Sequence, residues 1–137
     1  MAKDIYHDAV REALEKDGWI ITHDSFPFKV GEVGFFIDLG AEKLLVAEKG
    51  YEKIAVEVKS FIKSSPLNAF HEALGQYENY LLALEDYEPD RILYLAVPAN
   101  AYGSFFQKPF IQKVINRRNL RIIVYESSAK TIVQWIK

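Results

Sequence analysis

The chain has 137 residues, of which 50% are hydrophobic, and a formal net charge of -2. This length and composition predict one globular domain over residues 1–137, large enough to bury about two-thirds of its extended surface. The absence of cysteine excludes disulfides, thiolate metal ligands and a cysteine nucleophile. The sequence has neither an apolar run of the roughly 18 residues that a membrane span needs nor an N-terminal signal core. We therefore expect a cytoplasmic protein without a membrane segment.

Charge is distributed unevenly along the chain. Residues 1–107 contain 10 Lys and Arg against 18 Asp and Glu, whereas residues 108–137 contain 7 against 1. Because nucleic-acid affinity comes largely from neutralised phosphates, the basic C-terminal part predicts a DNA contact. The candidate residues are Lys113, Arg117, Arg118 and Arg121. Docking onto an acidic protein surface is the alternative interpretation of these charges.

The N-terminal part predicts a helix followed by a short strand. Apolar residues recur at intervals of three and four over residues 4–16, which indicates an amphipathic helix. Residues 19–22 predict a strand, and residues 23–28, which contain a proline, predict a loop. Most charges of the helix are expected at the surface, although His7 or Glu12 would overhang a site if the helix packed beside the strand described next.

Residues 54–61 form an apolar stretch that carries the charged residues Glu57 and Lys59. Side chains alternate along a strand, so this acid and base share one face. Charges without a role are costly to bury in the middle of a sheet. A carboxylate can hold Mg²⁺, which prefers oxygen ligands, and a lysine beside it can orient a water or stabilise charge on a phosphate. An ion pair on a solvated sheet face is the alternative interpretation.

The segment before this strand is predicted to pair with it as an antiparallel hairpin. Residues 33–48 should fold back onto residues 53–61 through a turn at residues 49–52. If Glu48 faces Lys53, then Glu57 lies opposite Leu44 and Lys59 lies opposite Glu42.

Two acids of the first hairpin strand compete for a place beside Glu57. Asp38 and Glu42 both share the face of Glu57 and Lys59, because opposed residues point the same way. In the expected register, Asp38 would lie about 20 Å along the strand from the position opposite Glu57, unless a bulge at Gly40–Ala41 bent it closer. Glu42 is the nearer acid on a regular ladder, and the residues alone leave both open.

The second half of the chain predicts a helix and a further set of strands. Ser65 as N-cap and Pro66 as first helical residue predict a helix to about Leu84. Its stripe of small residues carries Gln76 and Tyr80, which reach the site if that stripe faces the strand. A strand–helix–strand connection implies parallel neighbours, so the sheet is expected to be mixed. The remaining elements are a strand at 91–97, helices at 102–106 and 109–118, a strand at 120–125 and an edge strand at 131–136.

The element order α-β-β-β-α-β-α-β-β, with an acid on the first hairpin strand and Glu-x-Lys on the second, resembles the core of the PD-(D/E)XK nuclease superfamily. The resemblance implies an α/β fold of the restriction-endonuclease-like type, with a mixed central sheet flanked by helices. It also implies that Asp38 and Glu57 would match the acids that hold Mg²⁺ or Mn²⁺, and that Lys59 would match the catalytic lysine.

The segment Gln76-Tyr77-Glu78-Asn79-Tyr80 is similar to the Gln-apolar-x-x-Tyr pattern of the RecB-like members of that superfamily. Gln76 and Tyr80 would then be the accessory catalytic pair. Glu12 would match the acid that some members place on the first helix, and Glu42 stays a further candidate from the hairpin.

The whole chain resembles the XisH family, the fdxN element excision controlling factors of cyanobacteria. The resemblance implies an accessory role in the programmed excision of a DNA element, with DNA, a separate site-specific recombinase and the companion factor XisI as partners. Two functions follow, namely a Mg²⁺-dependent DNA endonuclease, which would need a homodimer for a double-strand break, or a non-catalytic control factor that binds DNA or XisI. The stretches that carry the resemblance are 17–19, 37–42, 54–61, 75–77 and 93–98.

Overall fold

The computed structural model describes residues 2–44, 51–62 and 64–137. Within them, one mixed sheet has helices on both faces. The strands are β1 (Ile20–Val30), β2 (Val33–Leu44), β3 (Tyr51–Val58), β4 (Arg91–Pro98), β5 (Ile122–Glu126) and β6 (Thr131–Ile136). The helices are α1 (Ala2–Lys16), α2 (Pro66–Tyr87), α3 (Ala99–Gly103) and α4 (Pro109–Arg118), with a 3-10 turn η1 (Phe105–Gln107). No helix in the described part of the chain is long and apolar enough to cross a membrane.

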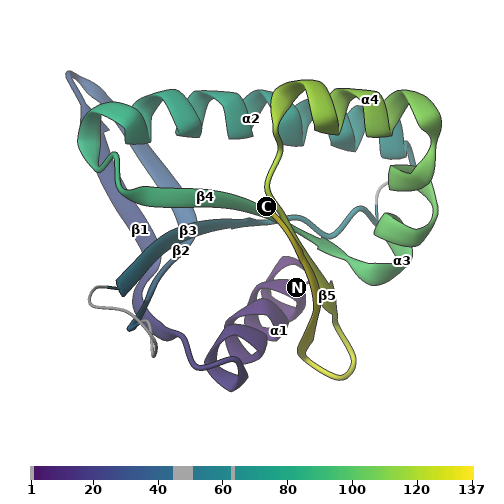
Figure 1. Ribbon diagram of the computed structural model, residues 1–137, viewed down its shortest axis with the longest axis horizontal. Coiled ribbons are helices and arrows are strands. Elements are labelled where there is room, and N and C mark those ends of the chain that lie inside the picture. Colours follow the sequence, from purple (N-terminus) through teal and green to yellow (C-terminus); the bar gives the residue numbers. More distant parts are fainter. Residues whose placement is uncertain (1, 45–50, 63) are drawn as a thin grey trace.

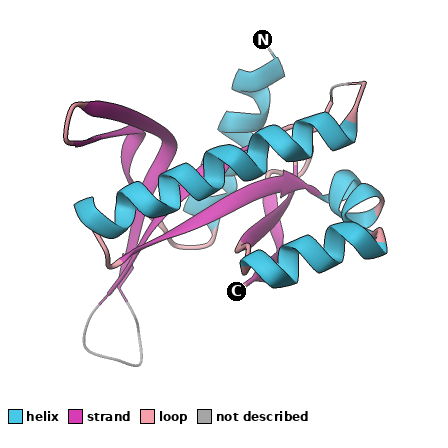
Figure 2. Cartoon of the chain, turned by 90° about the horizontal axis from the view of Figure 1, so that it is seen from above, coloured by secondary structure: helices cyan, strands magenta, loops and turns pink. Residues whose placement is uncertain are grey.

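The six strands lie side by side in the order in which they occur along the chain. β3, β4 and β5 are parallel, whereas β1–β2, β2–β3 and β5–β6 pair antiparallel. The predicted mixed sheet is therefore confirmed. Helices α2 and α4 cover one face of the sheet, and α1 lies against the other (Figure 1). Seen from above, α2 runs along the sheet beside α4 (Figure 2).

Each face of the sheet has its own hydrophobic core. The face under α2 buries Phe70 and Tyr77 against Leu93 and Leu95, and the face over α1 buries Leu14 against residues that include Val56. On β3, Ile54, Val56 and Val58 belong to the α1 side and Ala55 to the α2 side. By this alternation Glu57 and Lys59 share a face, as the sequence predicts, and that face is turned toward α2.

The predicted loop at residues 23–28 is wrong, because these residues belong to β1. β1 is an edge strand, and a proline, which has no N–H to donate, is tolerated there. Phe26 and Phe28 are both buried and alternate with exposed residues, as expected for a strand with one face on the core. His23, expected in a loop, also lies on β1 and packs edge-on against Phe26 with 4.9 Å between ring centroids.

The register of the β2–β3 hairpin differs from the predicted one. Lys53 pairs with Glu42 instead of Glu48, and Leu39 pairs with Val56. The pairing of β2 with β3 is continuous from Leu39 to Leu44, so β2 has no bulge at residues 40–41 on this side. The irregularity at this point lies in β1, between Ile21 and His23, opposite Ala41 and Gly40. Registers that differ by an even number of residues keep the same side chains on each face, so alternation alone does not choose between them.

The predicted hairpin turn is only partly described. Tyr51 and Glu52 belong to β3, while Glu48, Lys49 and Gly50 lie outside the described residues. The longer connection lets Ile54 and Val56 meet Ala41 and Leu39 on the α1 face, where all four side chains are buried. This burial decides the register.

The long helix begins as predicted and ends one turn later. Ser65 Oγ accepts a hydrogen bond from the Asn68 N–H at 3.2 Å, and Pro66 occupies the first turn. The helix continues to Tyr87, beyond the expected end at Leu84. The helix expected at residues 102–106 is instead α3 followed by η1, and β5 begins at residue 122 instead of 120.

Candidate functional site

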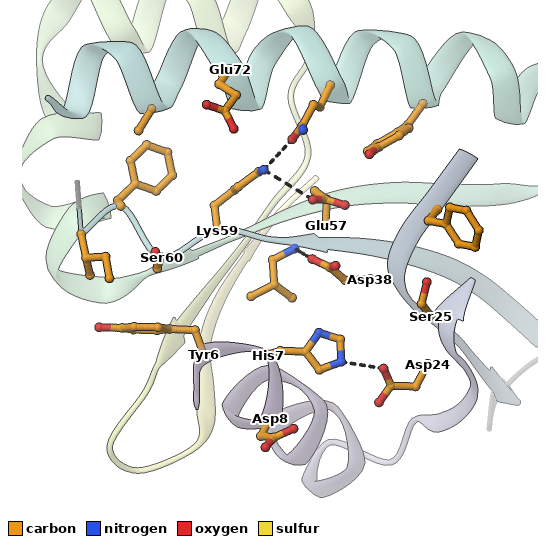
Figure 3. A pocket seen from close by; sticks show the side chains of 17 residues that line it. Tyr6, His7, Asp8, Asp24, Ser25, Asp38, Glu57, Lys59, Ser60 and Glu72 are labelled. Atoms are coloured by element: carbon orange, nitrogen blue, oxygen red, sulfur yellow. Dashed lines mark hydrogen bonds and ion pairs between the residues drawn. The ribbon is translucent and has the colours of Figure 1, made fainter. Parts of the chain in front are cut away.

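A groove of about 1100 Å³ opens where β3 ends. Its walls come from the first turns of α1, from β1, β2, the end of β3 with the loop after it, and from one face of α2. Figure 3 shows α2 along one side of the groove and α1 along the other, with Lys59 and Glu57 between them. In α/β sheets, ligands bind in crevices outside the carboxyl ends of the parallel strands, which is where this groove lies.

The five residues that the sequence assigns to the catalytic set all line this groove. They are Asp38, Glu57, Lys59, Gln76 and Tyr80. The β2–β3 pairing ends at Leu39 and Val56, the residues directly next to Asp38 and Glu57. The Asp38 carboxylate also accepts a hydrogen bond from the Val58 N–H at 2.8 Å. The observed register therefore brings Asp38, and not Glu42, to the end of β3.

Lys59 is held from two directions. Its ammonium lies 3.5 Å from Glu57 Oε2 and donates a hydrogen bond to Gln76 Oε1 at 2.5 Å. Its backbone N–H donates to Ala96 O at 2.9 Å, and its carbonyl accepts from the Tyr125 hydroxyl at 2.9 Å. The lysine is thus fixed at both ends before any ligand binds, which reduces the conformational cost of using it.

Tyr80 faces both carboxylates from α2. Burial, together with the negative charges of Glu57 and Asp38, raises the pKa of Tyr80 to about 12. The phenol is therefore neutral at any ordinary pH, and its hydroxyl can act as a hydrogen-bond donor toward an anionic ligand. Glu57 itself is only 7% exposed, at the end of a strand whose other residues are mostly buried.

The donor set of the groove fits a hard divalent cation. Asp38 and Glu57 supply carboxylate oxygens, the ligands that Mg²⁺ prefers. Among the described residues, no three His, Asp or Glu side chains come together as a complete protein shell. Mg²⁺ commonly takes one or two carboxylates and completes its coordination with water and substrate phosphate. Asp38 and Glu57 in an open groove match this mode of Mg²⁺ coordination.

Asp24 is one of the other charged residues that line the groove. Asp24 on β1 accepts hydrogen bonds from His7 Nε2 at 2.6 Å and from Arg11 Nη1 at 2.6 Å. Burial raises the pKa of Asp24, but the hydrogen bonds from Arg11 and His7 outweigh it and hold that pKa below its usual value. Asp24 therefore stays ionised and fixes the His7 ring. The sequence pointed to His7 on the helix but not to Asp24, because their pairing depends on how α1 docks beside β1.

The two additional acids lie elsewhere. Glu42 Oε1 is 3.5 Å from the Nη2 of Arg91, a guanidinium that is buried at the other end of β3. Glu12 Oε2 is 3.6 Å from Lys130 Nζ at an exposed position near the β5–β6 turn. Neither side chain is among the residues that line the groove.

The basic residues of the C-terminal part are also separate from the groove. Lys113, Arg117 and Arg118 are exposed on α4, and Arg121 is half-buried just before β5. The groove itself is acidic, and of the described residues that line it, Lys59 is the only Lys or Arg. The acids that line it are Asp8, Asp24, Asp38, Glu57 and Glu72.

Comparison with known proteins gives a consistent result. Residues 1–133 match the family described as XisH protein. The chain is similar to the crystal structure of an XisH family protein from Nostoc punctiforme PCC 73102, with 44% identity, a TM-score of 0.88, and coverage of 98% of this chain and 100% of that one. It is equally similar to an fdxN element excision controlling factor protein from Anabaena variabilis, with 44% identity, a TM-score of 0.88, and coverage of 98% and 99%. No curated protein matches the chain.

Proposed function

The chain belongs to the XisH family, and from this membership we propose that it is an accessory factor that controls excision of a DNA element. We further propose that its groove is a nuclease-like site that cleaves phosphodiester bonds with Mg²⁺ or Mn²⁺. On this proposal, the protein would belong with the PD-(D/E)XK superfamily. The single observation that carries the proposal is the meeting of Asp38, Glu57 and Lys59 in one groove.

A structural explanation does not account well for this arrangement. A Glu–Lys pair that only stabilised the sheet would need no second carboxylate beside it. Here Asp38 is brought to the same place from β2, and Gln76 reaches down from α2 to hold the lysine. Three elements that are distant in sequence thus converge on one point of an open groove, as they do in catalytic sites.

The roles of the residues follow from their chemistry. Asp38 and Glu57 would hold the metal, which when bound supplies Lewis-acid stabilisation of a phosphate. Lys59 would orient the attacking water or stabilise the charge that builds on the phosphate. Gln76 fixes the lysine, and the neutral Tyr80 hydroxyl donates a hydrogen bond to a phosphate oxygen.

The partners remain part of the proposal. The basic residues Lys113, Arg117, Arg118 and Arg121 would contact DNA phosphates outside the groove, and XisI and a site-specific recombinase would complete the excision machinery. One groove per chain makes one cut, so a double-strand break would require a homodimer.

A non-catalytic control factor is the second candidate, and the separation of charges favours it. The basic surface on α4 does not line the groove, so DNA or a protein partner could be bound there without any use of the acidic residues. In that case binding would depend on α4 and would be insensitive to changes at Lys59.

Nicking of a supercoiled plasmid in Mg²⁺ or Mn²⁺ tests the catalytic proposal. Lys59→Ala should lower the nicking rate about a hundredfold or more, because loss of one preorganised donor typically costs that much. Lys53→Ala is the matched control, since Lys53 is on the same strand and the same face but lies at its other end. A folded native protein that cuts neither the plasmid nor a single-stranded DNA with either metal, or a Lys59→Ala variant that nicks normally, would refute a catalytic groove.

A further inference from the structure

We propose that the groove accepts an unpaired DNA strand and holds it by stacking a base on Phe36, instead of gripping duplex DNA through its phosphates. The inference rests on the proposed function of the groove and adds the class of substrate. It is carried by the position of one exposed aromatic ring and by the charges of the groove walls.

Phe36 is a large apolar side chain left in solvent at the edge of the groove. It is 68% exposed, and it lines the groove together with Asp38. Its neighbours along β2 point the other way, because Phe35 stacks on Phe28 with 5.2 Å between ring centroids and Ile37 is fully buried. The phenyl ring of Phe36 therefore contributes nothing to the core, and its position needs another explanation.

The strand geometry places this ring beside the proposed cleavage site. Residues two apart on a strand share a face and are separated by about 7 Å. Phe36 and Asp38 are related in this way on β2. Successive nucleotides are separated by a similar length, so a base stacked on Phe36 would belong to a nucleotide next to the phosphate held at Asp38.

Other apolar groups continue the wall on the far side of the groove. Ile62, in the loop after β3, is 56% exposed and lines the groove, and the half-buried Tyr6 does so from α1. Tyr6 packs edge-on against Tyr125 with 6.4 Å between ring centroids, so its ring is held in place. Base stacking on such side chains tolerates any sequence, since every base has a flat face.

The charges of the groove argue against a duplex. A duplex draws most of its affinity from phosphates neutralised by Lys and Arg. The described lining supplies one such residue, Lys59, against five carboxylates, and the basic residues of α4 are not part of it. A single strand is a polyanion too, but its unpaired bases can stack on exposed rings, which adds affinity that the paired bases of a duplex cannot supply.

The test compares binding of a fluorescent single strand of about 12 nucleotides with that of the matching duplex, by anisotropy in Ca²⁺. We expect the native protein to bind the single strand at least tenfold more tightly. Phe36→Ala should weaken single-strand binding about tenfold, whereas Phe36→Trp should retain it. Phe110→Ala is the matched control, because Phe110 is 65% exposed on α4 and does not line the groove.

The inference is overturned if the duplex binds as tightly as the single strand, if neither binds, or if Phe36→Ala behaves like Phe110→Ala. These results are distinguishable from a failure of the proposed cleavage. A strand that is bound through Phe36 but never cut in Mg²⁺ or Mn²⁺ would support the binding mode and refute the nuclease. Cleavage that is unchanged by Phe36→Ala would support the nuclease and refute the proposed binding mode.

Discussion

Strand β3 carries a charged cluster at each end, and the two clusters differ in what surrounds them. At its start, the Arg91 guanidinium donates to Ile54 O at 2.8 Å and to both carboxylate oxygens of Glu88, while Lys53 lies 3.3 Å from the same glutamate. The Arg91 side chain is 2% exposed and stacks over the ring of Phe26 at 4.6 Å. At the other end of β3, Glu57 and Lys59 face an open groove.

The difference separates a structural role from a functional one. Around Arg91 the donors are taken up by protein acceptors, and the cluster ties β2, β3, β4 and the end of α2 together. Around Lys59 the protein fixes the side chains but leaves room beside them. Removing one partner from a buried, fully paired cluster destabilises the fold, whereas charges held in place next to a cavity are available to a ligand.

Replacing Arg91 should give the largest effect, and it tests whether the cluster at the start of β3 has a structural role. Arg91→Met removes the buried guanidinium that donates to Ile54 O and Glu88, so we expect the free energy of unfolding to fall by about 3 kcal/mol. Urea denaturation followed by circular dichroism measures it. Lys53→Met should cost much less, because the Lys53 ammonium keeps access to solvent and its ion pairs are screened. Equal losses in both variants would show that the cluster is not centred on Arg91.

A matched pair of acid substitutions tests which carboxylate belongs to the groove. Asp38→Asn should lower Mg²⁺-dependent nicking about a hundredfold or more, because it removes a charge at the proposed metal position. Glu42→Gln should leave nicking within about twofold, since Glu42 faces Arg91 and not the groove. If Glu42→Gln lowered nicking and Asp38→Asn did not, the assignment of function to the groove end of β3 would be wrong.

The pH dependence of stability should come in part from the Arg91 cluster. Burial raises the pKa of Glu88, but the hydrogen bonds and charges of Arg91 and Lys53 outweigh it, so the pKa of Glu88 lies below its usual value. A carboxyl with a lowered folded-state pKa stabilises the protein above its unfolded-state pKa, and this stability is lost as the pH falls through the folded-state value.

Glu88→Gln provides the measurement. The variant should be less stable than the native protein at pH 7, and the gap should close as the pH drops below the ordinary glutamate range. Denaturation midpoints of both proteins at several pH values measure this difference in stability. A gap that stays constant down to low pH would mean that Glu88 titrates as it does in the unfolded chain.

The smallest effect is expected at Glu12. Its ion pair with Lys130 is about half exposed on both sides, with 47% and 49% of the side chains accessible. Glu12→Gln should change the free energy of unfolding by no more than about 0.5 kcal/mol. It should also leave nicking unchanged, and a loss of nicking would place a functional residue outside the groove.

Much of this molecule follows from local patterns in its sequence. The alternation of residues 54–59 determines that Glu57 and Lys59 leave the sheet on the same face, whatever the neighbouring strands do. Ser65 and Pro66 determine where α2 begins, because a cap and a first-turn proline act within one turn. From that starting point, helical spacing places Gln76 and Tyr80 on one side of the helix.

Other features were decided only by tertiary structure. The register that brings Asp38, and not Glu42, to the end of β3 depends on burial against α1 and on a connection longer than a tight turn. The pairing of Asp24 with His7 and Arg11 depends on how α1 docks beside an edge strand that contains proline. Periodicity determines which face a side chain occupies, because it is a property of neighbouring residues. It does not determine which distant residue lies opposite, because side chains on the same face remain there when a strand slides by two residues.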